Sequence, residues 1–357
     1  MTDADYMRMA LALAAKGAGW VSPNPMVGAV LVKGGEIIGR GYHRQYGGPH
    51  AERAALADCT VSPEGAALYV TLEPCCHHGK TPPCTQAVLA SGIRRVVAGV
   101  RDPNPLMAGK GLALLRAAGV EVAEGVLEDE CRALNEVFFH YIRTQTPYVV
   151  MKYAMTMDGM TATRTGQSKW ITGEAARQRV HRDRGRYSAV MVGVGTVLAD
   201  DPLLTCRAEG GRNPVRIVCD THLRTPPDSQ IVKTAGEVPT IIATTCADEE
   251  KRKPLADLGC RILTAPQKDG RVDLTELMAL LGKEKIDSIL LEGGGTLHRS
   301  FLQSGLVNKV QAYIAPKLFG NADVPAQACL LANSRVELLG GDFLIESEVA
   351  RHVHGDC

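Results

Sequence analysis

The chain has 357 residues, a formal net charge of +1 at pH 7 and only 4% aromatic residues. Its length predicts two domains, and its near-neutral charge argues against the large electrostatic surface that nucleic acids and anionic lipids require. No apolar run reaches the length of a membrane span, and the first residues do not have the shape of a signal peptide. Eleven cysteines, mostly scattered singly, suit a reducing compartment, so we predict a cytoplasmic protein with neither nucleic-acid nor membrane partners.

In the first half of the chain, helical and extended patterns alternate. The predicted helices are residues 5–16, 51–57, 84–91, 111–118 and 128–143. The predicted strands are residues 27–32, 36–41, 66–72, 94–100 and 120–123. Strands that alternate with helices pack as layers, so this half predicts an α/β sandwich. The segment Thr144-Gln145-Thr146-Pro147 breaks the last helical pattern, which places the predicted boundary between domains 1–146 and 147–357.

Potential metal ligands stand at the ends of these predicted strands. His50 and Glu52 open one helix, and Cys75 follows a strand and a proline. A zinc-dependent deaminase requires three protein ligands, an open position for water and a carboxylate that carries protons without binding the metal. Cys84 is predicted in the first turn of a helix that starts with proline, where the helix dipole stabilises a thiolate. Cys76 is less suitable, because adjacent side chains rarely point at one centre.

Other interpretations of this segment remain open. Cysteines in cytoplasmic proteins often only fill the core, which would leave the histidine unrelated to any metal. A structural zinc site would instead close its fourth position with a further protein ligand. The residues available for that are Cys76, His77 and His78. A nucleoside or tRNA deaminase is less well supported, because it uses the short P-C-x-x-C spacing, whereas Cys84 stands nine positions after Cys75.

The second half begins with an apolar strand, residues 148–155, that contains Lys152. The further predicted elements are helix 174–184, strands 189–194 and 215–219, and a strand from residue 288 that leads through three glycines into helix 297–304. Backbone amides at that helix start suit a phosphate, although a tight turn explains the glycines equally well. Neither common nucleotide motif is present, since Leu198 replaces the third glycine of the dinucleotide fingerprint and no Walker lysine follows the glycines.

Several motifs together resemble the RibD family, the bifunctional deaminase/reductases of riboflavin biosynthesis. The first half contributes HAE and TLEPCCHHGKTPPC, and the second half contributes GxSxWIT, GxGTVLxDDPxLTxR and EGGxxL. The resemblance implies a cytidine-deaminase-like α/β/α sandwich followed by a dihydrofolate-reductase-like α/β domain. It also implies one zinc ion per chain, NADPH as the second cofactor, and a homo-oligomer, either a dimer or a tetramer. The implied reactions are the hydrolytic deamination of 2,5-diamino-6-(5-phosphoribosylamino)pyrimidin-4-one and the NADPH-dependent reduction of the ribosyl side chain to ribityl phosphate.

Position by position, the resemblance implies site residues in both halves. In the deaminase half it places zinc on His50, Cys75 and Cys84, and proton transfer on Glu52. The residues implied for the phosphorylated pyrimidine substrate are Asn24, His77, Lys80, Asp102 and Asn104. The residues implied for the reductase cofactor are Ala154, Trp170, Thr196, Asp200, Thr221, Gly294, Gly295, Thr296, Leu297, His298, Arg299 and Ser300. The residues implied for the reductase substrate are Ser168, Arg184, Leu204, Arg207 and Glu292.

Some of these residues have simpler explanations. Asx-Pro pairs, which include Asn24 and Asn104, often only make turns. A buried Lys152 needs an edge position or an anionic partner, because an unpaired buried ammonium is costly. We hypothesise that Lys152 and Asp200 flank the reacting sugar carbon, where Lys152 stabilises charge and Asp200 positions or delivers a proton. The alternative is a lysine that reaches solvent from an edge strand and an aspartate that caps a turn.

Arginines of the second half are candidates for binding a phosphate group. Arg184 and Arg207 can each donate two hydrogen bonds to phosphate oxygens, because the guanidinium group is planar and forked. One departure from the family pattern follows this segment, where Ser188 stands in place of a common aspartate. We expect that departure to affect packing at the helix end more than catalysis.

Overall fold

The computed structural model describes residues 1–78, 82–105, 107–162, 170–316 and 331–349. The chain divides into two compact units, Met1–Gln145 and Thr146–Cys357, and each unit has its own sheet and hydrophobic core. Within the described residues, no helix combines the length and the apolar character that crossing a membrane requires.

The first unit is built on a five-stranded sheet in the order β2-β1-β3-β4-β5. Its strands are β1 (Gly28–Lys33), β2 (Glu36–Tyr42), β3 (Ala67–Leu72), β4 (Arg95–Val100) and β5 (Glu121–Glu124). β1 runs antiparallel to both β2 and β3, whereas β3, β4 and β5 are parallel. The carboxyl ends of β2, β3 and β4 and the start of β1 therefore meet at one edge, and the loops at this edge carry the predicted deaminase residues.

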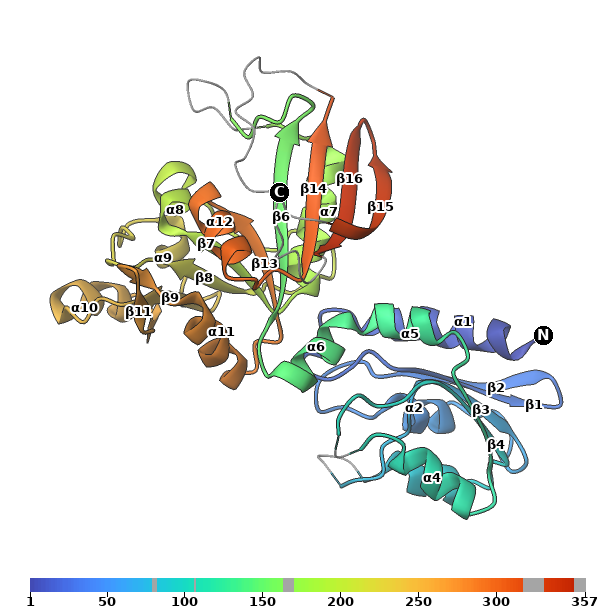
Figure 1. The fold of residues 1–357 in the computed structure, drawn as a ribbon. Helices are drawn as coiled ribbons and strands as arrows, with labels where there is room; N and C mark the ends of the chain where they lie inside the picture. The colour runs from blue at the N-terminus through green and yellow to red at the C-terminus, as the bar shows by residue number, and fades with distance from the viewer. Residues whose placement is uncertain (79–81, 106, 163–169, 317–330, 350–357) are drawn as a thin grey trace, which may run out of the picture. The chain divides into compact units, whose positions relative to one another are not determined.

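Helices cover both faces of this sheet (Figure 1). The layer on one face contains α1 (Asp3–Ala14), α5 (Glu128–Leu134) and α6 (Glu136–Thr144), and the layer on the other face contains α2 (Ala51–Ala57), α3 (Cys84–Ala90) and α4 (Lys110–Ala117). A capping box between Thr2 and Asp5 fixes the start of α1, because it satisfies backbone amides that the helix leaves unpaired. The layers follow the predicted alternation of helices and strands.

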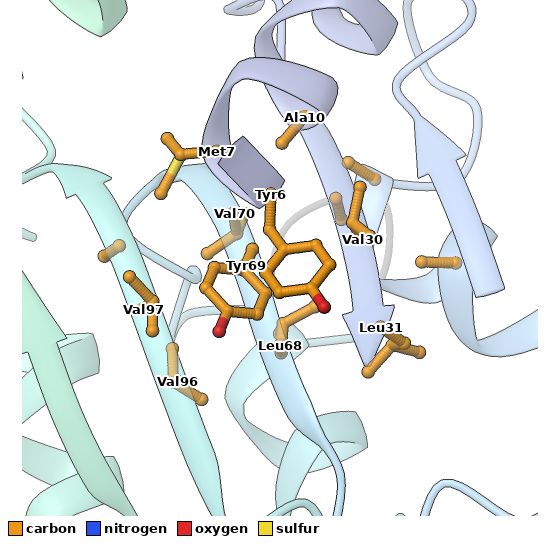
Figure 2. Close-up of a cluster of buried hydrophobic side chains, with 14 of the residues drawn as sticks. Tyr6, Met7, Ala10, Val30, Leu31, Leu68, Tyr69, Val70, Val96 and Val97 are labelled. Atoms are coloured by element: carbon orange, nitrogen blue, oxygen red, sulfur yellow. The ribbon is translucent and has the colours of Figure 1, made fainter. Parts of the chain in front are cut away.

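The core of the first unit forms where α1 lies over the sheet (Figure 2). Tyr6, Met7 and Ala10 of α1 are each at most 4% exposed, and they pack with the buried Val30 and Tyr69 of the sheet. The ring centroids of Tyr6 and Tyr69 lie 4.9 Å apart. Burial of each large apolar side chain contributes on the order of 1.5–3 kcal/mol, so these contacts hold α1 on the sheet.

The single helix predicted for residues 128–143 is wrong, because Asn135 interrupts it. Asn135 has φ −106° and ψ 24°, and it separates α5 from α6. Its side chain is buried and pairs with both backbone groups of Met26, accepting from the amide at 2.8 Å and donating to the carbonyl at 2.9 Å. A short amide side chain that bonds to backbone groups competes with the helix, so the break follows from a partner far away in the sequence.

The prolines before Cys84 lie ahead of α3 and not within its first turn. Pro83 is the N-cap residue, with ψ 138°, and Cys84 is the first helical residue. A proline restricts the residue before it to extended backbone, so the helix can begin only after the pair. Cys84 still lies in the first turn, as predicted.

The second unit is built on a nine-stranded sheet in the order β10-β9-β8-β7-β13-β6-β14-β16-β15 (Figure 1). Its strands are β6 (Tyr148–Thr156), β7 (Ala189–Gly193), β8 (Val215–Cys219), β9 (Thr240–Thr244), β10 (Arg261–Thr264), β13 (Ser288–Gly293), β14 (Lys309–Ala315), β15 (Leu331–Leu339) and β16 (Asp342–Val349). The strands from β10 to β14 in this order are parallel, so their carboxyl ends meet at one edge, and β16 and β15 continue the sheet antiparallel. A separate hairpin, β11 (Gln267–Lys268) and β12 (Arg271–Val272), follows β10.

Both faces of the parallel part of this second sheet are buried. The helices of the described part of the unit are α7 (Glu174–Arg186), α8 (Val194–Asp200), α9 (Gln230–Lys233), α10 (Glu249–Asp257), α11 (Leu274–Lys283) and α12 (Gly295–Gln303). Along β7, Met191 packs into one hydrophobic cluster, while Val190 and Val192 pack into another on the opposite face. Burial of both faces explains why β7, β9 and β13 are largely apolar along their length and do not alternate with polar residues.

Several details of the second unit differ from the predictions. β6 lies between β13 and β14 in the interior of the sheet, so the edge-strand explanation of Lys152 is wrong. Asp200 is the last residue of α8, and the left-handed backbone, at φ 41°, occurs one residue later at Asp201. α12 begins at Gly295 and not at residue 297, because Gly294 turns the chain at φ 87° as the N-cap residue.

Candidate metal centre and cofactor cavity

Three side chains with metal-binding atoms converge at the loop-bearing edge of the first sheet. His50 is the N-cap residue of α2, Cys75 follows β3, and Cys84 begins α3. Nδ1 of His50 lies 3.5 Å from Sγ of Cys75 and 3.4 Å from Sγ of Cys84. Tetrahedral zinc, with bonds of about 2.05 Å to nitrogen and 2.3 Å to sulfur, separates such atoms by roughly 3.6 Å. The two distances from His50 thus match the spacing that a zinc ion requires, and all three ligand atoms lie within 4.8 Å of one another.

The protonation of the two cysteines also suits a bound cation. The hydrogen bond from Cys84 lowers the pKa of the Cys75 thiol to about 4, and His50 acts in the same direction. The same contact, together with burial, raises the pKa of Cys84, which therefore holds the proton. The backbone amide of Cys84 also donates to the Cys75 sulfur at 3.4 Å. A divalent cation at this point would replace the proton and stabilise both thiolates.

Glu52 lies beside the three ligand atoms without belonging to their group. It is in the first turn of α2 and is only 3% exposed. Burial raises the pKa of its carboxyl group to about 6, and the negative charge of Cys75 adds to the shift. A carboxyl group with such a pKa can both take and release a proton near neutral pH, as a general acid and base must.

Among the described residues, no fourth histidine, cysteine or carboxylate joins this cluster. Cys76 is half-buried next to Cys75, and its sulfur is not within the group of converging ligand atoms. His77 and His78 are exposed, and they do not belong to the group either. A set of three protein ligands leaves one tetrahedral position for water or substrate, which distinguishes catalytic zinc sites from structural ones.

Asn24 is connected to the cluster through His43, which the sequence did not reveal as a site residue. The side-chain amide of Asn24 lies 3.1 Å from Nε2 of His43, and Nδ1 of His43 lies 2.9 Å from the carbonyl oxygen of Pro49. Because a carbonyl oxygen can only accept, Nδ1 carries the proton and Nε2 accepts from Asn24. The rings of His43 and His50 pack edge to face with centroids 5.4 Å apart. Asn24 is thereby held at the same sheet edge as the candidate metal ligands.

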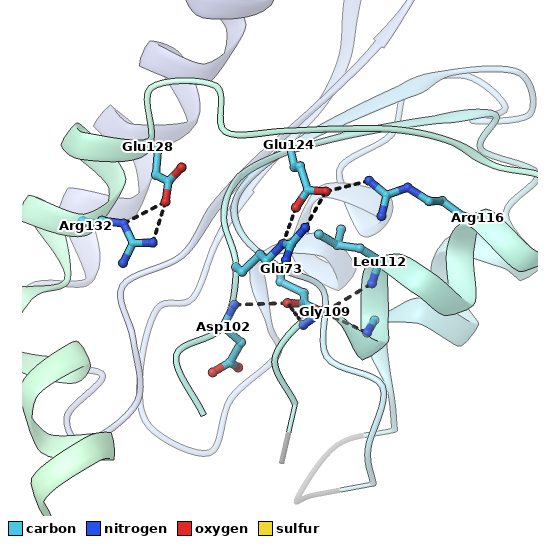
Figure 3. Close-up of polar contacts among 10 residues, drawn as sticks. Glu73, Asp102, Gly109, Leu112, Arg116, Glu124, Glu128 and Arg132 are labelled. Atoms are coloured by element: carbon cyan, nitrogen blue, oxygen red, sulfur yellow. Dashed lines mark hydrogen bonds and ion pairs between the residues drawn. The ribbon is translucent and has the colours of Figure 1, made fainter. Parts of the chain in front are cut away.

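Glu73 organises the loop that follows β4 (Figure 3). Its buried carboxylate accepts from the backbone amides of Asp102 at 3.2 Å, Gly109 at 2.9 Å, Gly111 at 2.8 Å and Leu112 at 3.3 Å. These bonds tie the end of β3, which delivers Cys75, to the loop and to the first turn of α4. The only signal for this role in the sequence was a carboxylate directly after an apolar strand.

Of the other predicted substrate residues of the first unit, the described ones, His77, Asp102 and Asn104, lie around this loop. Asp102 accepts from the backbone amide of Asn104 at 2.8 Å, and burial raises the pKa of the Asp102 carboxyl group. His77 and Cys75 are both close enough to influence that pKa electrostatically. Lys80 lies outside the described residues. The structure therefore brings Asp102, His77 and the metal cluster to the same edge of the sheet.

In the second unit, Lys152, Arg184 and Glu292 form a charge cluster that is largely shielded from solvent. Arg184 donates to the two carboxylate oxygens of Glu292 at 2.6 and 2.8 Å, and to the carbonyl oxygen of Thr205 at 3.1 Å. Burial lowers the pKa of Lys152, and Glu292 opposes this shift. The Lys152 amine also lies 5.6 Å from the ring centre of Tyr313. Arg184 thus has a protein carboxylate as its partner, whereas the sequence had suggested a phosphate.

A cavity of about 980 Å³ lies at the carboxyl edge of the second sheet. The predicted cofactor residues that line it are Thr221, Gly294, Thr296, Leu297 and Ser300. Thr196 lies close to this wall, because a side chain at Gly294, which lines the cavity, would lie 3.7 Å from its hydroxyl oxygen. The volume is at the upper end of the range for small-molecule sites, roughly 300–1,000 Å³, and therefore suits a ligand as large as a dinucleotide.

The remaining predicted residues of the second unit do not line this cavity. For the cofactor, these described residues are Ala154, Trp170, Thr196, Asp200, Gly295, His298 and Arg299. Trp170 is 65% exposed and lies under the guanidinium group of Arg177, 4.7 Å from its ring centre. For the substrate, Leu204 is buried at φ 53°, Arg207 is exposed, and Ser168 lies outside the described residues.

Two protein-family models match the chain. The cytidine and deoxycytidylate deaminase zinc-binding region matches residues 1–100, and the RibD C-terminal domain matches residues 147–340. Riboflavin biosynthesis protein RibD of Actinobacillus pleuropneumoniae is 54% identical over 357 residues, which cover 97% of this chain and 95% of that protein. The RibD protein of Escherichia coli K12 is 44% identical over 334 residues, which cover 90% of this chain and 89% of that protein. The chain belongs to the RibD family.

Solved RibD structures share the whole fold. Acinetobacter baumannii RibD, form 1, is 38% identical with a TM-score of 0.88, and the match covers 98% of this chain and 99% of that one. A diaminohydroxyphosphoribosylaminopyrimidine deaminase/5-amino-6-(5-phosphoribosylamino)uracil reductase from Thermotoga maritima is 39% identical with a TM-score of 0.85, again over 98% and 99%. These matches confirm the predicted fold class, with a cytidine-deaminase-like domain followed by a RibD reductase domain.

As a RibD family member, the protein is a bifunctional deaminase and reductase of riboflavin biosynthesis. The family has a zinc-binding deaminase domain and an NADPH-using reductase domain, which confirms the two predicted cofactors. The His50, Cys75 and Cys84 cluster is a set of side chains that can hold the metal.

The RibD reductase cavity also has wall residues that the sequence did not reveal. Arg224 follows β8, and Lys268 and Arg271 belong to the β11–β12 hairpin. All three are exposed, so in the sequence they were indistinguishable from charges on a solvated surface. Only the positions of the loop after β8 and of the hairpin at the cavity identify the three as candidate functional residues.

Proposed function

We propose that residues 1–146 carry out the deamination and residues 147–357 carry out the reduction. The substrates we propose are those in the name of the T. maritima relative, a diaminopyrimidine that carries a phosphoribosylamino group and then its deaminated product. The observation that supports this division is the composition of the two sites. A three-ligand metal cluster with a buried proton carrier occurs in one unit, and a dinucleotide-sized cavity near buried charges occurs in the other.

The residues of the first unit divide the work of deamination. His50, Cys75 and Cys84 would hold zinc, which when bound supplies a Lewis acid that makes water nucleophilic near neutral pH. The Glu52 carboxylate takes a proton from the attacking water and passes it to the departing amine. Its raised pKa, about 6, suits both transfers. Asn24 and the loop of Asp102 lie at the same edge, where they can orient the polar edge of the pyrimidine ring.

In the second unit, the cavity wall would bind NADPH, which when bound supplies the hydride. Lys152 is the group we assign to the sugar oxygen on which negative charge develops, because an ammonium group that is partly shielded from solvent stabilises such charge strongly. Glu292 and Arg184 hold the surroundings of Lys152 fixed through their paired hydrogen bonds. Asp200 is the last residue of α8, the helix that follows β7. In the sheet, β13 lies between β7 and β6, the strand that carries Lys152, so Asp200 and Lys152 come from strands that are not neighbours. We therefore drop the pairing of Asp200 with Lys152, and the assignment of Asp200 to the cofactor stays with the family resemblance.

Product masses after incubation with the diaminopyrimidine substrate test this proposal. Without NADPH, the expected product has one amine replaced by a carbonyl oxygen and an unchanged sugar. With NADPH, the expected product has two further hydrogens on the sugar chain. A chain that reduces the substrate without first deaminating it, or that deaminates it after complete zinc removal, contradicts the proposal.

We also propose that the protein is located in the cytoplasm and forms a homo-oligomer, a dimer or tetramer. The location is supported by the cysteines of the described residues, which are all free. The assembly is supported by the strand β15 at the sheet edge, which exposes Val336 by 67% and Leu338 by 64%. An exposed apolar edge strand commonly pairs with another chain. Light scattering of the wild type and of Val336→Lys/Leu338→Lys tests the assembly. A monomeric wild type contradicts it.

A further inference from the structure

We propose that Arg224, Lys268 and Arg271 bind the 2′-phosphate that distinguishes NADPH from NADH. This inference rests on the proposed function, because it requires the cavity of the second unit to hold the cofactor. All three side chains line that cavity, and they come from two separate elements. Arg224 lies in the loop after β8, whereas the other two lie on the β11–β12 hairpin.

The hairpin places its two cations side by side. Lys268 and Arg271 are register partners in the antiparallel pair, so both side chains leave the same face of the hairpin. Asp269 at φ 50° and Gly270 at φ 75° form the turn between them, which fixes this pairing. Like charges directly opposite each other destabilise a strand pair. An anion between them would remove that repulsion, and the cavity offers the space for one.

These cations are not neutralised by the protein. In the part of the chain that the structure describes, none of the three side chains takes part in an ion pair. Two carboxylates also line the cavity. Asp273 caps α11 by accepting from the amides of Thr275 at 2.9 Å and Glu276 at 3.3 Å, and Asp269 belongs to the hairpin turn. Three unpaired cations against these two carboxylates leave this wall positively charged.

The position of these residues along the sheet edge fits the adenosine end of the cofactor. The reacting nicotinamide must lie near Lys152 on β6 and Glu292 on β13. From β6 the sheet continues through β13 and β7 to β8, then to β9 and β10. Neighbouring strands are about 4.8 Å apart, so the loop after β8 lies roughly 14 Å from β6 and the hairpin after β10 lies farther still. An extended dinucleotide that passes Gly294 at the start of α12 therefore brings its adenosine ribose to Arg224 and the hairpin.

The chemistry of the two cofactors gives the expected effect. NADPH carries a phosphate dianion on the adenosine ribose, whereas NADH carries a neutral hydroxyl group at that position. A guanidinium or ammonium group gains a charge-assisted hydrogen bond from the phosphate and almost nothing from the hydroxyl. We expect each lost cation to weaken NADPH binding about tenfold and to leave NADH binding nearly unchanged.

Isothermal titration of the full, zinc-loaded chain tests the proposal without relying on turnover. The ligands are NADPH, NADH, and the half-molecules 2′,5′-ADP and 5′-ADP, which differ only in the 2′-phosphate. The variants are Arg224→Ala and Lys268→Ala/Arg271→Ala, and the matched control is Lys253→Ala, which removes an exposed cation from α10 away from the cavity wall. We expect the double variant to lose about 100-fold in affinity for NADPH and 2′,5′-ADP and to bind NADH and 5′-ADP as the wild type does. The control should bind all four like the wild type.

Two results would overturn the inference. Equal losses for NADPH and NADH would mean that the cations bind a part that both cofactors share, such as the pyrophosphate. Unchanged NADPH affinity in the double variant would mean that the 2′-phosphate is bound elsewhere. A further variant, Thr296→Trp, fills the cavity itself, since Thr296 lines it. If that variant still binds NADPH normally, the cavity is not the cofactor site, and the proposed function of the cavity fails before the question of specificity arises.

Discussion

The two candidate sites differ in how their side chains are held. In the first unit, His50, Cys75 and Cys84 are short side chains at element ends, and Nδ1 of His50 lies within 3.5 Å of both cysteine sulfurs. In the second unit, the cavity wall includes long, exposed cations from a loop and a hairpin. A metal requires each ligand within about 0.2 Å of its ideal position, whereas a phosphate accepts several arrangements of positive charge. We therefore expect the first site to fail with one substitution and the second to weaken in steps.

Cys84→Ser is expected to have the largest effect. The hydroxyl group is a poor zinc ligand compared with a thiolate, so the variant should lose its zinc and its deaminase activity together. NADPH binding by the second unit should remain as in the wild type. Metal analysis of the purified protein and the rate of deamination measure the two losses.

Cys76→Ser is the matched control for Cys84→Ser, since it makes the same exchange at a cysteine outside the cluster. This control should keep its zinc and its activity. If Cys76→Ser loses zinc while Cys84→Ser retains it, the assignment of the third ligand is wrong.

Glu52→Gln separates metal binding from proton transfer within the first site. Because Glu52 is outside the ligand group, the variant should bind zinc as tightly as the wild type. Loss of a general acid and base typically costs about 10²–10⁴ in rate, so deamination should fall by that factor. Hydride transfer to the already deaminated substrate should be unchanged, and a large loss there in a folded, zinc-loaded variant would contradict two separate sites.

The difference between the sites also explains what the sequence could predict. The metal site was predictable because its chemistry demands particular residue types, and because His50, Cys75 and Cys84 all stand next to predicted strand or helix ends. Neither Glu73 nor His43 could be found in this way: Glu73 acts on backbone amides that lie up to 39 residues away, and His43 acts through the Pro49 carbonyl and the Asn24 side chain, neither of which belongs to a sequence motif with it. The break at Asn135 was hidden for the same reason, because its partner, Met26, is 109 residues away.

The cavity wall was less predictable than the metal site for a further reason. Thr221 and Gly294 could be assigned through the resemblance, but Lys268 and Arg271 occur in a short hairpin whose sequence resembles any solvated turn. The central position of Lys152 was also hidden, because an apolar strand with one lysine fits an edge and an interior position equally well. Strand order, which decides this, depends on pairings between segments far apart in the chain.

Arg184→Ala tests whether the buried charges of the second unit depend on one another as the metal ligands do. The ion pair with Glu292 is largely shielded, with side-chain exposures of 15% and 7%. Removing one partner of a buried pair costs about 3–5 kcal/mol, because the other charge stays buried without its hydrogen bonds. We expect the lower end of that range, since Lys152 remains near Glu292. Urea denaturation of the full chain measures the loss of stability.

Arg261→Ala is the control for this change, since it removes an arginine paired with Glu284 at the surface. Surface ion pairs contribute at most about 1 kcal/mol, so the control should be nearly as stable as the wild type. Equal stability losses in Arg184→Ala and Arg261→Ala would show that the buried pair has no special role.

Glu73→Gln is expected to have the smallest effect, and it tests whether the deaminase site extends beyond the metal ligands. The carboxylate accepts from four backbone amides between Asp102 and Leu112, whereas a glutamine has only one oxygen and turns an amide group toward the same donors. The cost should be about 1–3 kcal/mol, confined to the loop and the start of α4. Zinc content should stay the same, because Glu73 is not a ligand, while KM for the diaminopyrimidine should rise more than kcat falls. Hydrogen exchange of amides 102–112 should accelerate.

Glu124→Gln, which only breaks surface pairs with Arg101 and Arg116, provides the control for Glu73→Gln and should leave KM and exchange unchanged. If Glu73→Gln behaves like this control, the loop keeps its shape without the carboxylate, and the first site is confined to the metal ligands and Glu52.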